Sequence, residues 1–466
     1  MRAAGGPFPA KDIVKACRGV LLRGNGECVF PAITTDSRDV RKGDLFVPLK
    51  GLNFDGHDFL IPALEAGARG SLATRDVNRE IPSNLANIVL VQVQDTLQAL
   101  SDLASAHRDT FSIPLIAVTG SSGKTTVKEM IAAVLRRSHH PLVSQANFNN
   151  LIGLPMTVLN LSLEHTVAVV EAGINTVGEM DELSRAASPD VAVITNIGPV
   201  HLEGLGSIEN VAREKFKLVR SLSSTGSAVV PAYDPYVEPL VSEWGGRFVT
   251  FGVDRGDYRA EDVRLGAETF FELVCPHGRR EIRIKIQGRH NVANALAAAA
   301  AAMAVGATLD DVREGLADFL PPDSRMEIVP LPGNRTLIRD CYNANPQSVT
   351  AALEVLAGSG ASERSLAVLG DMAELGPRSR ELHEYIGGRA AVLGISRLVF
   401  VGRYGRFFMD GFTSAGGHPE RLTVVPDKET AWDVVRLLAG EYGIILVKGS
   451  RAMKMELIAD RIVGEN

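Results

Sequence analysis

The chain of 466 residues is too long for one ordinary domain, so two to four domains are expected. Hydrophobic residues make up 45% of it and charged residues 22%, a balance typical of globular proteins. The net charge of −6 argues against nucleic acid or an anionic membrane as the main partner, so any anion site has to be built locally.

Cysteine usage and the N-terminus favour a cytoplasmic protein without membrane insertion. Charged residues between positions 11 and 18 interrupt the N-terminus, so no signal peptide is expected. The weakly polar run 295–307 is short for a membrane span and rich in alanine. No CxxC pair and no zinc-ligand spacing occurs among the cysteines, which indicates reduced thiols at Cys17, Cys28, Cys275 and Cys341.

Three regions of the chain differ in pattern, which predicts three α/β domains. Residues 1–111 mix short apolar runs with turn signals, as in a small α/β domain. Residues 112–320 alternate apolar runs at 113–118, 167–170 and 191–194 with helical stretches, as in a parallel sheet covered by helices. Residues 321–466 follow Pro321-Pro322 and repeat the alternation, which predicts a Rossmann-like, doubly wound domain. Its strands are expected at 366–369, 398–401, 422–425 and 444–447.

The strongest motif is TGSSGKTT, residues 119–126, which lies between a predicted strand and a predicted helix. Glycines let backbone N–H groups approach phosphate oxygens, and the start of the helix adds a favourable field. The lysine can reach the β- and γ-phosphates, and the first threonine after it can coordinate Mg²⁺. The flanking strand and helix disfavour the alternative of an ordinary turn. The predicted nucleotide site comprises Gly120, Ser121, Ser122, Gly123, Lys124, Thr125 and Thr126.

Two further candidates follow the next strands of the central region. Glu171 ends the apolar run 167–170, and a carboxylate at the carboxyl end of a parallel strand lies where such sheets bind ligands. His201 follows the run 191–194 in TNIGPVHLEGLGS. A solvent-facing glutamate and an incidental loop histidine are the alternatives, and the neighbouring phosphate loop favours a metal site.

These segments are similar to those of the Mur ligase and folylpolyglutamate synthetase superfamily. TGSSGKTT, EAGINTVGEM, TNIGPVHLEGLGS and VAREKFKL follow one another as they do in Mur ligases. The resemblance implies that Thr125, Glu171 and His201 hold Mg²⁺, with two ions expected, and that Lys215 becomes an N-carboxylysine. Carbamylation turns a cation into an anion that can bridge metal ions, but only the neutral amine reacts with CO₂. Many relatives carry an acidic residue where Lys217 stands, so the role of that position is open.

The resemblance also extends to the nucleotide's other end. The segment GRHNVAN, residues 288–294, matches the family's adenine-contacting segment and implies Asn291 and, chiefly, Asn294 as adenine contacts. From the residues alone, helix capping by Asn291 is equally probable. Arg325 matches the arginine that approaches the nucleotide phosphates, and Asp340 can accept hydrogen bonds from the ribose. The third domain would then close over ATP and exclude water.

Three segments are similar to the branch of the family that adds D-alanyl-D-alanine: DCYNANPQSVTAAL, LGDMAELG and VKGSR. A MurE-type chain, which adds an amino acid, would carry DYAHTPD-type and DNPR-type segments, and neither occurs. The segment TTDSRDVRKGDLFVPLKGLNFDGHDF resembles the domain that holds the UDP end of the substrate, with a supporting turn at Asp55-Gly56-His57. The expected substrate contacts are Ser37, Arg38, Asn147, Asn343 and Asn345.

The resemblance implies an ATP-dependent ligase that joins D-alanyl-D-alanine to UDP-N-acetylmuramoyl-tripeptide through an acyl phosphate. Lys124, Lys215, His201 and Arg325 would be its catalytic residues. A monomer with small-molecule substrates and no nucleic-acid partner is expected. The alternatives are a MurE-type ligase, a folylpolyglutamate synthetase, or a phosphate-loop regulatory protein that only binds nucleotide. Against the last, no NKxD-type guanine motif occurs.

Overall fold

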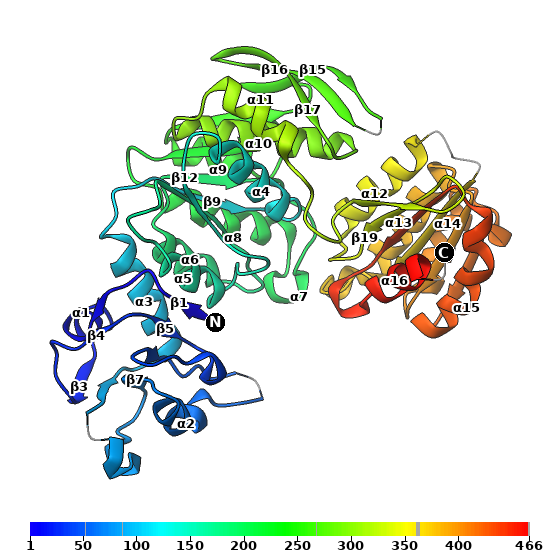
Figure 1. Ribbon diagram of the computed structural model, residues 1–466. Helices are drawn as coiled ribbons and strands as arrows, with labels where there is room; N and C mark the ends of the chain where they lie inside the picture. Colours follow the sequence, from blue (N-terminus) through cyan, green and yellow to red (C-terminus); the bar gives the residue numbers. More distant parts are fainter. Residues whose placement is uncertain (52, 86, 267, 360–363, 465–466) are drawn as a thin grey trace.

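Three bodies follow one another along the chain in the computed structural model, each built on its own sheet (Figure 1). The structure describes residues 1–51, 53–85, 87–266, 268–359 and 364–464. The mixed α/β architecture with largely parallel sheets confirms the fold class expected from the alternation of apolar runs. Within the described ranges, none of the helices combines the length and apolar character that a membrane crossing requires.

The N-terminal body carries a sheet in the order β1-β5-β6-β7-β8-β3, parallel from β5 to β8, beside a two-stranded sheet of β2 and β4. Its strands are β1 (Arg2–Ala3), β2 (Phe8–Pro9), β3 (Val20–Arg23), β4 (Val29–Phe30), β5 (Ile33–Thr34), β6 (Leu45–Phe46), β7 (Gly70–Ala73) and β8 (Val89–Gln92). Its helices are α1 (Ala10–Ala16), α2 (Leu60–Glu65) and α3 (Thr96–Arg108). Helix α3 also packs against α5 (Gly153–Val158) and α6 (Glu179–Ala187) of the central body and so joins the two bodies.

The central body carries a sheet in the order β10-β11-β9-β12-β13-β14-β15-β16-β17. Its strands are β9 (Leu115–Thr119), β10 (Pro141–Val143), β11 (Val167–Glu171), β12 (Val191–Ile194), β13 (Ser227–Pro231), β14 (Phe248–Gly252), β15 (Tyr258–Arg264), β16 (Thr269–Cys275) and β17 (Gly278–Ile284). Its helices are α4 (Lys124–Leu135), α5 (Gly153–Val158), α6 (Glu179–Ala187), α7 (Leu202–Leu205), α8 (Ile208–Arg220), α9 (Glu238–Trp244), α10 (Arg289–Ala304) and α11 (Leu309–Asp318).

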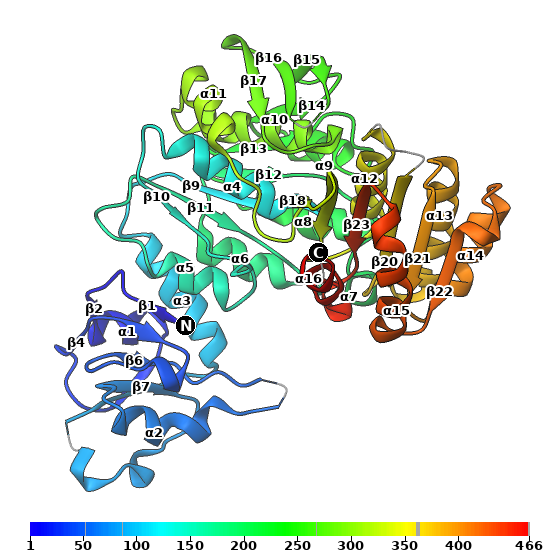
Figure 2. The ribbon, with the colours of Figure 1, turned by 45° about the vertical axis from the view of Figure 1, so that its right-hand side comes forward.

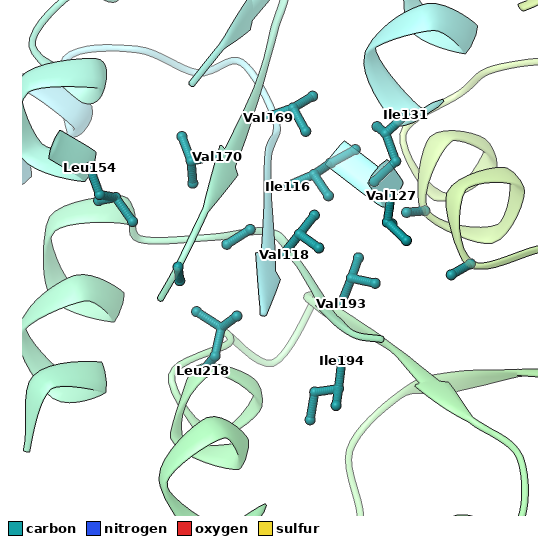
Figure 3. Close-up of a cluster of buried hydrophobic side chains, with 14 of the residues drawn as sticks. Ile116, Val118, Val127, Ile131, Leu154, Val169, Val170, Val193, Ile194 and Leu218 are labelled. Atoms are coloured by element: carbon teal, nitrogen blue, oxygen red, sulfur yellow. The ribbon is translucent and has the colours of Figure 1, made fainter. Parts of the chain in front are cut away.

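The core of the central body lies on both faces of β9, β11 and β12 (Figure 3). Every residue of these three strands is buried, which is why they read as continuous apolar runs. Figure 3 shows Val127 and Ile131 of α4 on one side of Ile116 and Val118, and Leu218 of α8 toward another. The helical spacing over residues 127–135 is confirmed, because Val127, Ile131, Val134 and Leu135 are all buried.

One part of the central sheet differs from the expected parallel arrangement. Strands β10 to β14 are parallel, but β15, β16 and β17 pair antiparallel and extend the sheet at its far edge. Alternating burial along β16 shows the reason, because this extension presents one face to α10 and α11 and the other to solvent. Pro276-His277-Gly278 is the turn signal that could have predicted the hairpin.

The C-terminal body carries a sheet in the order β18-β19-β23-β20-β21-β22, antiparallel only between β18 and β19. Its strands are β18 (Glu327–Leu331), β19 (Arg335–Asp340), β20 (Ser365–Gly370), β21 (Arg397–Val401), β22 (Leu422–Val425) and β23 (Ile444–Lys448). Its helices are α12 (Pro346–Gly358), α13 (Ser379–Val392), α14 (Gly405–Ser414), α15 (Lys428–Leu438) and α16 (Glu456–Gly464). The four strands expected from the sequence are all present as β20, β21, β22 and β23.

The C-terminal body lies beside the central body, and α12 and α7 are on the sides that face each other (Figures 1 and 2). Helix α7 packs against the short 3₁₀ helix Gly376–Arg378 that follows β20. The two bodies therefore meet at loops that follow β12 on one side and β19 and β20 on the other.

Candidate active site

A cavity of about 620 Å³ lies where the central and C-terminal bodies meet. On the central side it is lined by the loops that follow β9, β10, β11 and β12, and by the start of α10. Strand β9 stands between β11 and β12 in the sheet, so the chain turns in opposite directions on its two sides, and ligands of such sheets bind at that point. Of the predicted site residues, the cavity brings together Ser121, Ser122, Gly123, Lys124, Thr125, Thr126, Asn147, Glu171, His201, Asn291, Asn294, Arg325, Asp340, Asn343 and Asn345.

The phosphate loop, residues 120–123, needs glycine at both ends. Gly120 has φ 148° and Gly123 has φ 76°, where L side chains are strained. An added Cβ on Gly120 would collide with Thr195 Oγ1, and one on Gly123 would lie 2.6 Å from Asn294 Oδ1. The loop thus passes close to the backbone end of β12 and to α10, and its free N–H groups at the start of α4 suit a phosphate.

Asn196, which the sequence analysis did not single out, holds this loop from the end of β12. Its backbone carbonyl accepts from Ser121 N at 2.9 Å, and its Oδ1 accepts from Ser122 N at 3.0 Å. Its Nδ2 donates to Ser122 O at 3.0 Å. The position of Asn196 directly after β12, in the TNIG segment, was the available signal.

Lys124 begins α4 and folds back over the loop, with Nζ donating to Gly120 O at 3.0 Å. Burial lowers the pKa of Lys124, and the guanidinium of Arg325 adds to the lowering while Glu171 opposes it. Arg325 comes from the C-terminal body, so cations from two bodies face the same space. Two positive side chains at a phosphate loop are suited to a polyphosphate.

Glu171 ends β11 and accepts two side-chain hydrogen bonds. Thr125 Oγ1 donates to its Oε2 at 2.7 Å, and Asn149 Nδ2 donates to its Oε1 at 2.7 Å. The carboxylate is buried, with 2% of the residue exposed. A buried carboxylate beside a hydroxyl offers the hard oxygen atoms that Mg²⁺ prefers.

Lys215 of α8 is completely buried, and its Nζ has no hydrogen-bond partner. Burial, and next the charge of Lys124, hold the pKa of Lys215 well below its usual range, although Glu171 and Glu214 act in the opposite sense. A buried ammonium without a partner is costly, so the side chain favours the neutral amine. An orphaned amine within electrostatic reach of Lys124 and Glu171 fits conversion to a carbamate, which would add oxygen atoms to this group.

Lys217, two positions further along α8, pairs with two carboxylates. Its Nζ contacts Asp181 at 2.7 Å and Glu214 at 2.8 Å, and it does not line the cavity. Glu214 in turn accepts from Gly178 N at 2.8 Å and Met180 N at 3.2 Å at the start of α6. Lys217 therefore belongs to the contact between α8 and α6.

His201 has φ 51° and directly precedes α7. Its Nδ1 lies 2.5 Å from Oε2 of Glu374 in the C-terminal body, and this imidazole lowers the pKa of the Glu374 carboxyl. Within the described ranges, no three side chains of the types His, Cys, Asp and Glu are grouped to hold a metal ion. The predicted metal site of Thr125, Glu171, His201 and Lys215 would therefore also need the Thr125 hydroxyl and a carbamate on Lys215.

The adenine candidates lie at the start of α10. Gly288 is the N-cap residue, so Asn291 does not cap the helix; its Nδ2 donates to Gln287 O at 2.7 Å. Asn294 Nδ2 donates to Asn291 Oδ1 at 2.9 Å, so the two amides orient each other. His290, which the sequence analysis passed over, also lines the cavity, and burial lowers its pKa to about 4. A neutral imidazole is therefore part of this wall.

The C-terminal body contributes a buried ion pair. Lys448 Nζ, at the end of β23, donates to Asp340 Oδ2 at 2.6 Å and to Asn343 O at 2.9 Å. Arg325 lies over the ring of Tyr342, 4.0 Å from its centroid. Lys448 was predicted only as part of VKGSR, because its partner Asp340 lies 108 positions away in the chain.

Asn345 caps α12 and also bonds to the phosphate loop. Its Oδ1 accepts from Ser348 N at 2.9 Å as the cap of α12, and its Nδ2 donates to Ser121 O at 3.3 Å. Asn343 is an exposed residue, and its Oδ1 accepts from Ala344 N at 2.9 Å.

Ser37 and Arg38 lie in the N-terminal body and do not line the cavity. Arg38 is exposed, and it forms a two-point ion pair with Asp36 at 2.9 and 2.8 Å. The expected turn is present, since His57 Nδ1 contacts Asp55 Oδ1 at 2.7 Å and His57 Nε2 accepts from Thr74 N at 3.2 Å.

Comparison with known proteins matches three family models in succession. They are described as Mur ligase family, catalytic domain, over residues 30–108; Mur ligase middle domain, over 118–302; and Mur ligase, glutamate ligase domain, over 324–451. The UDP-N-acetylmuramoyl-tripeptide--D-alanyl-D-alanine ligase of Escherichia coli (strain K12) is 38% identical over 446 residues, which cover 94% of this chain and 95% of that protein.

Two solved structures share the arrangement of the whole chain. A crystal structure of MurF from Acinetobacter baumannii has a TM-score of 0.90 at 31% identity and covers 99% of this chain and all of that one. A structure of the MurF ligase from Thermotoga maritima in complex with ADP has a TM-score of 0.82 at 26% identity and covers 93% of this chain and 97% of that one. With matching models over all three bodies and a relative this similar over its full length, the chain belongs to the Mur ligase family.

Proposed function

We propose that this protein joins D-alanyl-D-alanine to the C-terminal carboxylate of UDP-N-acetylmuramoyl-tripeptide, with conversion of ATP to ADP and phosphate, in peptidoglycan precursor synthesis. One observation carries the ligase chemistry: the buried, unpartnered amine of Lys215 lies in the electrostatic reach of Lys124 and Glu171 beside a phosphate loop. The full-length similarity to the Escherichia coli ligase supports this choice of substrates.

ATP would lie in the cavity with its phosphates on residues 120–126 and its adenine at Asn291 and Asn294. The triphosphate would then lie between Lys124 and Arg325, and Asp340 would accept from the ribose hydroxyls. The neutral imidazole of His290 lines the same wall of the cavity as Asn291 and Asn294. That a structural relative was solved in complex with ADP supports a nucleotide in this fold.

Thr125, Glu171, His201 and a carbamylated Lys215 would hold Mg²⁺, for which we propose two ions. When bound, Mg²⁺ supplies positive charge that offsets the phosphate oxygens. The carbamate forms when the neutral amine adds CO₂ and loses a proton, and burial of Lys215 supplies the neutral amine.

The chemistry needs activation because a carboxylate is anionic and its oxygen leaves poorly. The tripeptide carboxylate would attack the γ-phosphorus, which releases ADP and forms an acyl phosphate. The free amine of D-alanyl-D-alanine would attack the acyl carbon, and the resulting tetrahedral species would expel phosphate and lose a proton. Lys124 and Arg325 balance charge at the transferred phosphoryl group, and the C-terminal body excludes water from the acyl phosphate.

Other parts of the substrate would contact residues outside the phosphate loop. We propose Ser37 and Arg38 for the UDP end, on the N-terminal body, and Asn147, Asn343 and Asn345 for the peptide end. Arg38 can supply a fork of donors to a diphosphate if it exchanges its contact with Asp36. We further propose domains at 1–111, 112–320 and 321–466, a monomeric state and a cytoplasmic location, where ATP is available.

The rivals are a MurE-type ligase, a folylpolyglutamate synthetase and a regulatory nucleotide binder. The test is phosphate release by the purified protein with ATP, Mg²⁺ and UDP-N-acetylmuramoyl-tripeptide, with and without D-alanyl-D-alanine, and then with single amino acids or a folate as acceptor or substrate. We expect release only with both peptide substrates. Release with a single amino acid or a folate would favour another ligase, and no dependence on either substrate would favour a binder.

A further inference from the structure

We propose that Gln347 is a positioning residue that couples docking of the C-terminal body to the conformation of the phosphate loop. This inference rests on the proposed function in one respect: closure of the C-terminal body over a nucleotide is taken to serve catalysis. Gln347 is the second residue of α12, directly after Pro346, and its side chain crosses to the central body. Its Nε2 donates to Ile197 O at 2.8 Å.

The residue after that acceptor, Gly198, forms hydrogen bonds to the phosphate loop. Gly198 N donates to Ser121 Oγ at 2.9 Å, and Ser121 Oγ donates to Gly198 O at 3.2 Å. Ser121 N in turn donates to Asn196 O. The segment that receives Gln347 is therefore the same segment that sets the backbone of Ser121.

A second hydrogen bond connects the start of α12 to the central body. Asn345 Nδ2, two residues before Gln347, donates to Ser121 O at 3.3 Å. The start of α12 thus touches the phosphate loop directly at Ser121 and indirectly through Ile197 and Gly198. Most of the acceptors are backbone atoms, so the contact forms only when the loop and the segment after β12 have this conformation.

Close approach at Gly198 makes the contact specific. A Cβ on Gly198 would lie 2.6 Å from Gln347 Nε2 and closer still to its Cδ and Oε1. No φ in the left-handed region is required there, so alanine would be compatible with the backbone. A methyl group at position 198 would displace the flexible end of Gln347 and break its bond to Ile197 O.

A change at Gln347 tests these contacts between the bodies better than a change at Asn345, because Asn345 also caps α12. Gln347 is exposed near the start of its helix, so its truncation should leave the fold intact. The loss of one hydrogen bond between the bodies should change the ratio of closed to open molecules about threefold to tenfold.

The experiment measures closure directly. Leu163 of the central body and Leu437 of α15 are exposed, whereas the four native cysteines are buried, so L163C and L437C can carry a pair of fluorescent dyes. Single-molecule energy transfer is recorded with Mg²⁺ and AMP-PNP at a concentration that closes about half of the parent molecules. Gln347→Ala and Gly198→Ala should each lower the closed-to-open ratio threefold to tenfold, and Gln347→Glu, which keeps the size but lacks the donor, at least as much.

The double variant makes the test specific. Since both single changes break the same bond, G198A with Q347A should be no worse than either alone. Two controls on α12 should leave the ratio unchanged: Thr350→Ala, whose hydroxyl bonds to Pro346 O within the helix, and Gly358→Ala, where an added Cβ meets no described atom within 4 Å.

Ligation kinetics and melting separate positioning from folding. The kcat of Gln347→Ala should fall with the closed fraction while its melting temperature stays that of the parent. An unchanged closed-to-open ratio in Gln347→Ala, or fully additive effects of the two single changes, would overturn the proposal. If the parent releases no phosphate with both peptide substrates, the proposed function fails, and the energy-transfer result still decides the role of Gln347.

Discussion

Replacement of Lys448 by methionine should destabilise the C-terminal body. Lys448 is 2% exposed and Asp340 is 9% exposed, and their side chains meet at 2.6 Å. Methionine has a similar length but no charge. The change would leave the Asp340 carboxylate buried, and among the described residues Met326 N, at 3.2 Å, would be its remaining hydrogen-bond donor.

The expected cost is about 3 kcal/mol, the lower end of what removal of one partner from a buried ion pair costs. The lower end applies because part of the Asp340 side chain reaches the water of the cavity. The carbonyl of Asn343 also loses its donor, which adds to the loss. In the double variant Lys448→Met with Asp340→Asn the uncompensated charge is absent, so about 1–2 kcal/mol should return.

Urea unfolding followed by the fluorescence of Trp432 measures this cost. Trp432 packs on the core that contains Val447, next to Lys448, and the only other tryptophan, Trp244, can be replaced by phenylalanine in all variants. Arg421→Met removes an exposed cation from the same body and should change the free energy of unfolding by less than about 0.5 kcal/mol. A cost for Lys448→Met below about 1 kcal/mol, or no recovery in the double variant, would refute the reasoning.

Three further predictions concern the central body. Lys124→Ala should lower ligation by at least about 100-fold, because a cation at the transferred phosphoryl group is lost; phosphate release near the parent rate would contradict the phosphate-loop assignment. Lys215→Ala should be inactive and partly restored by a small carboxylic acid but not by bicarbonate, whereas Lys217→Met, whose side chain faces α6, should ligate at a rate near that of the parent. For His290 the folded pKa of about 4 lies below the unfolded value of 6.5, so the unfolded chain binds the extra proton and stability falls as the pH drops from 6.5 toward 4. In His290→Gln the decrease in the free energy of unfolding between pH 7 and pH 4.5 should be smaller than in the parent by up to about 3 kcal/mol. An equal decrease in both proteins would show that His290 titrates normally.

Local pattern determined most of the fold class and the phosphate loop. The phosphate loop at residues 119–126 could be predicted because a strand precedes it and a helix follows it. Both elements can be predicted from residues that are close in the sequence. Strands β11, β12 and β20 to β23 could also be predicted, because each is a short apolar run in the sequence. Glu171 was predicted because it ends a strand, where parallel sheets bring ligand-binding side chains together. Asp340 was predicted from the motif that contains it, and the structure shows that it too ends a strand.

Tertiary structure alone decided what each lysine of α8 does. Lys215 and Lys217 are two positions apart on one helix, so they face different directions. The spacing of Lys215 from Val211 and Leu218 places it on the apolar face, but it does not say which groups surround the amine. Packing of α8 against β9 and α6 leaves Lys215 enclosed without a partner and gives Lys217 the carboxylates of Asp181 and Glu214. The pKa of Lys215 follows from that enclosure, not from its sequence context.

The same holds for every contact across the cavity. Asn345 and Gln347 lie in one short motif, and they bond to Ser121 and Ile197, which lie 224 and 150 positions earlier in the chain. Lys448 and Asp340 pair over 108 positions. The sequence alone therefore determined which side chains end strands and begin helices, because these depend on neighbours along the chain. Their partners depend on how two separately folded sheets pack together, and only the tertiary structure decided that.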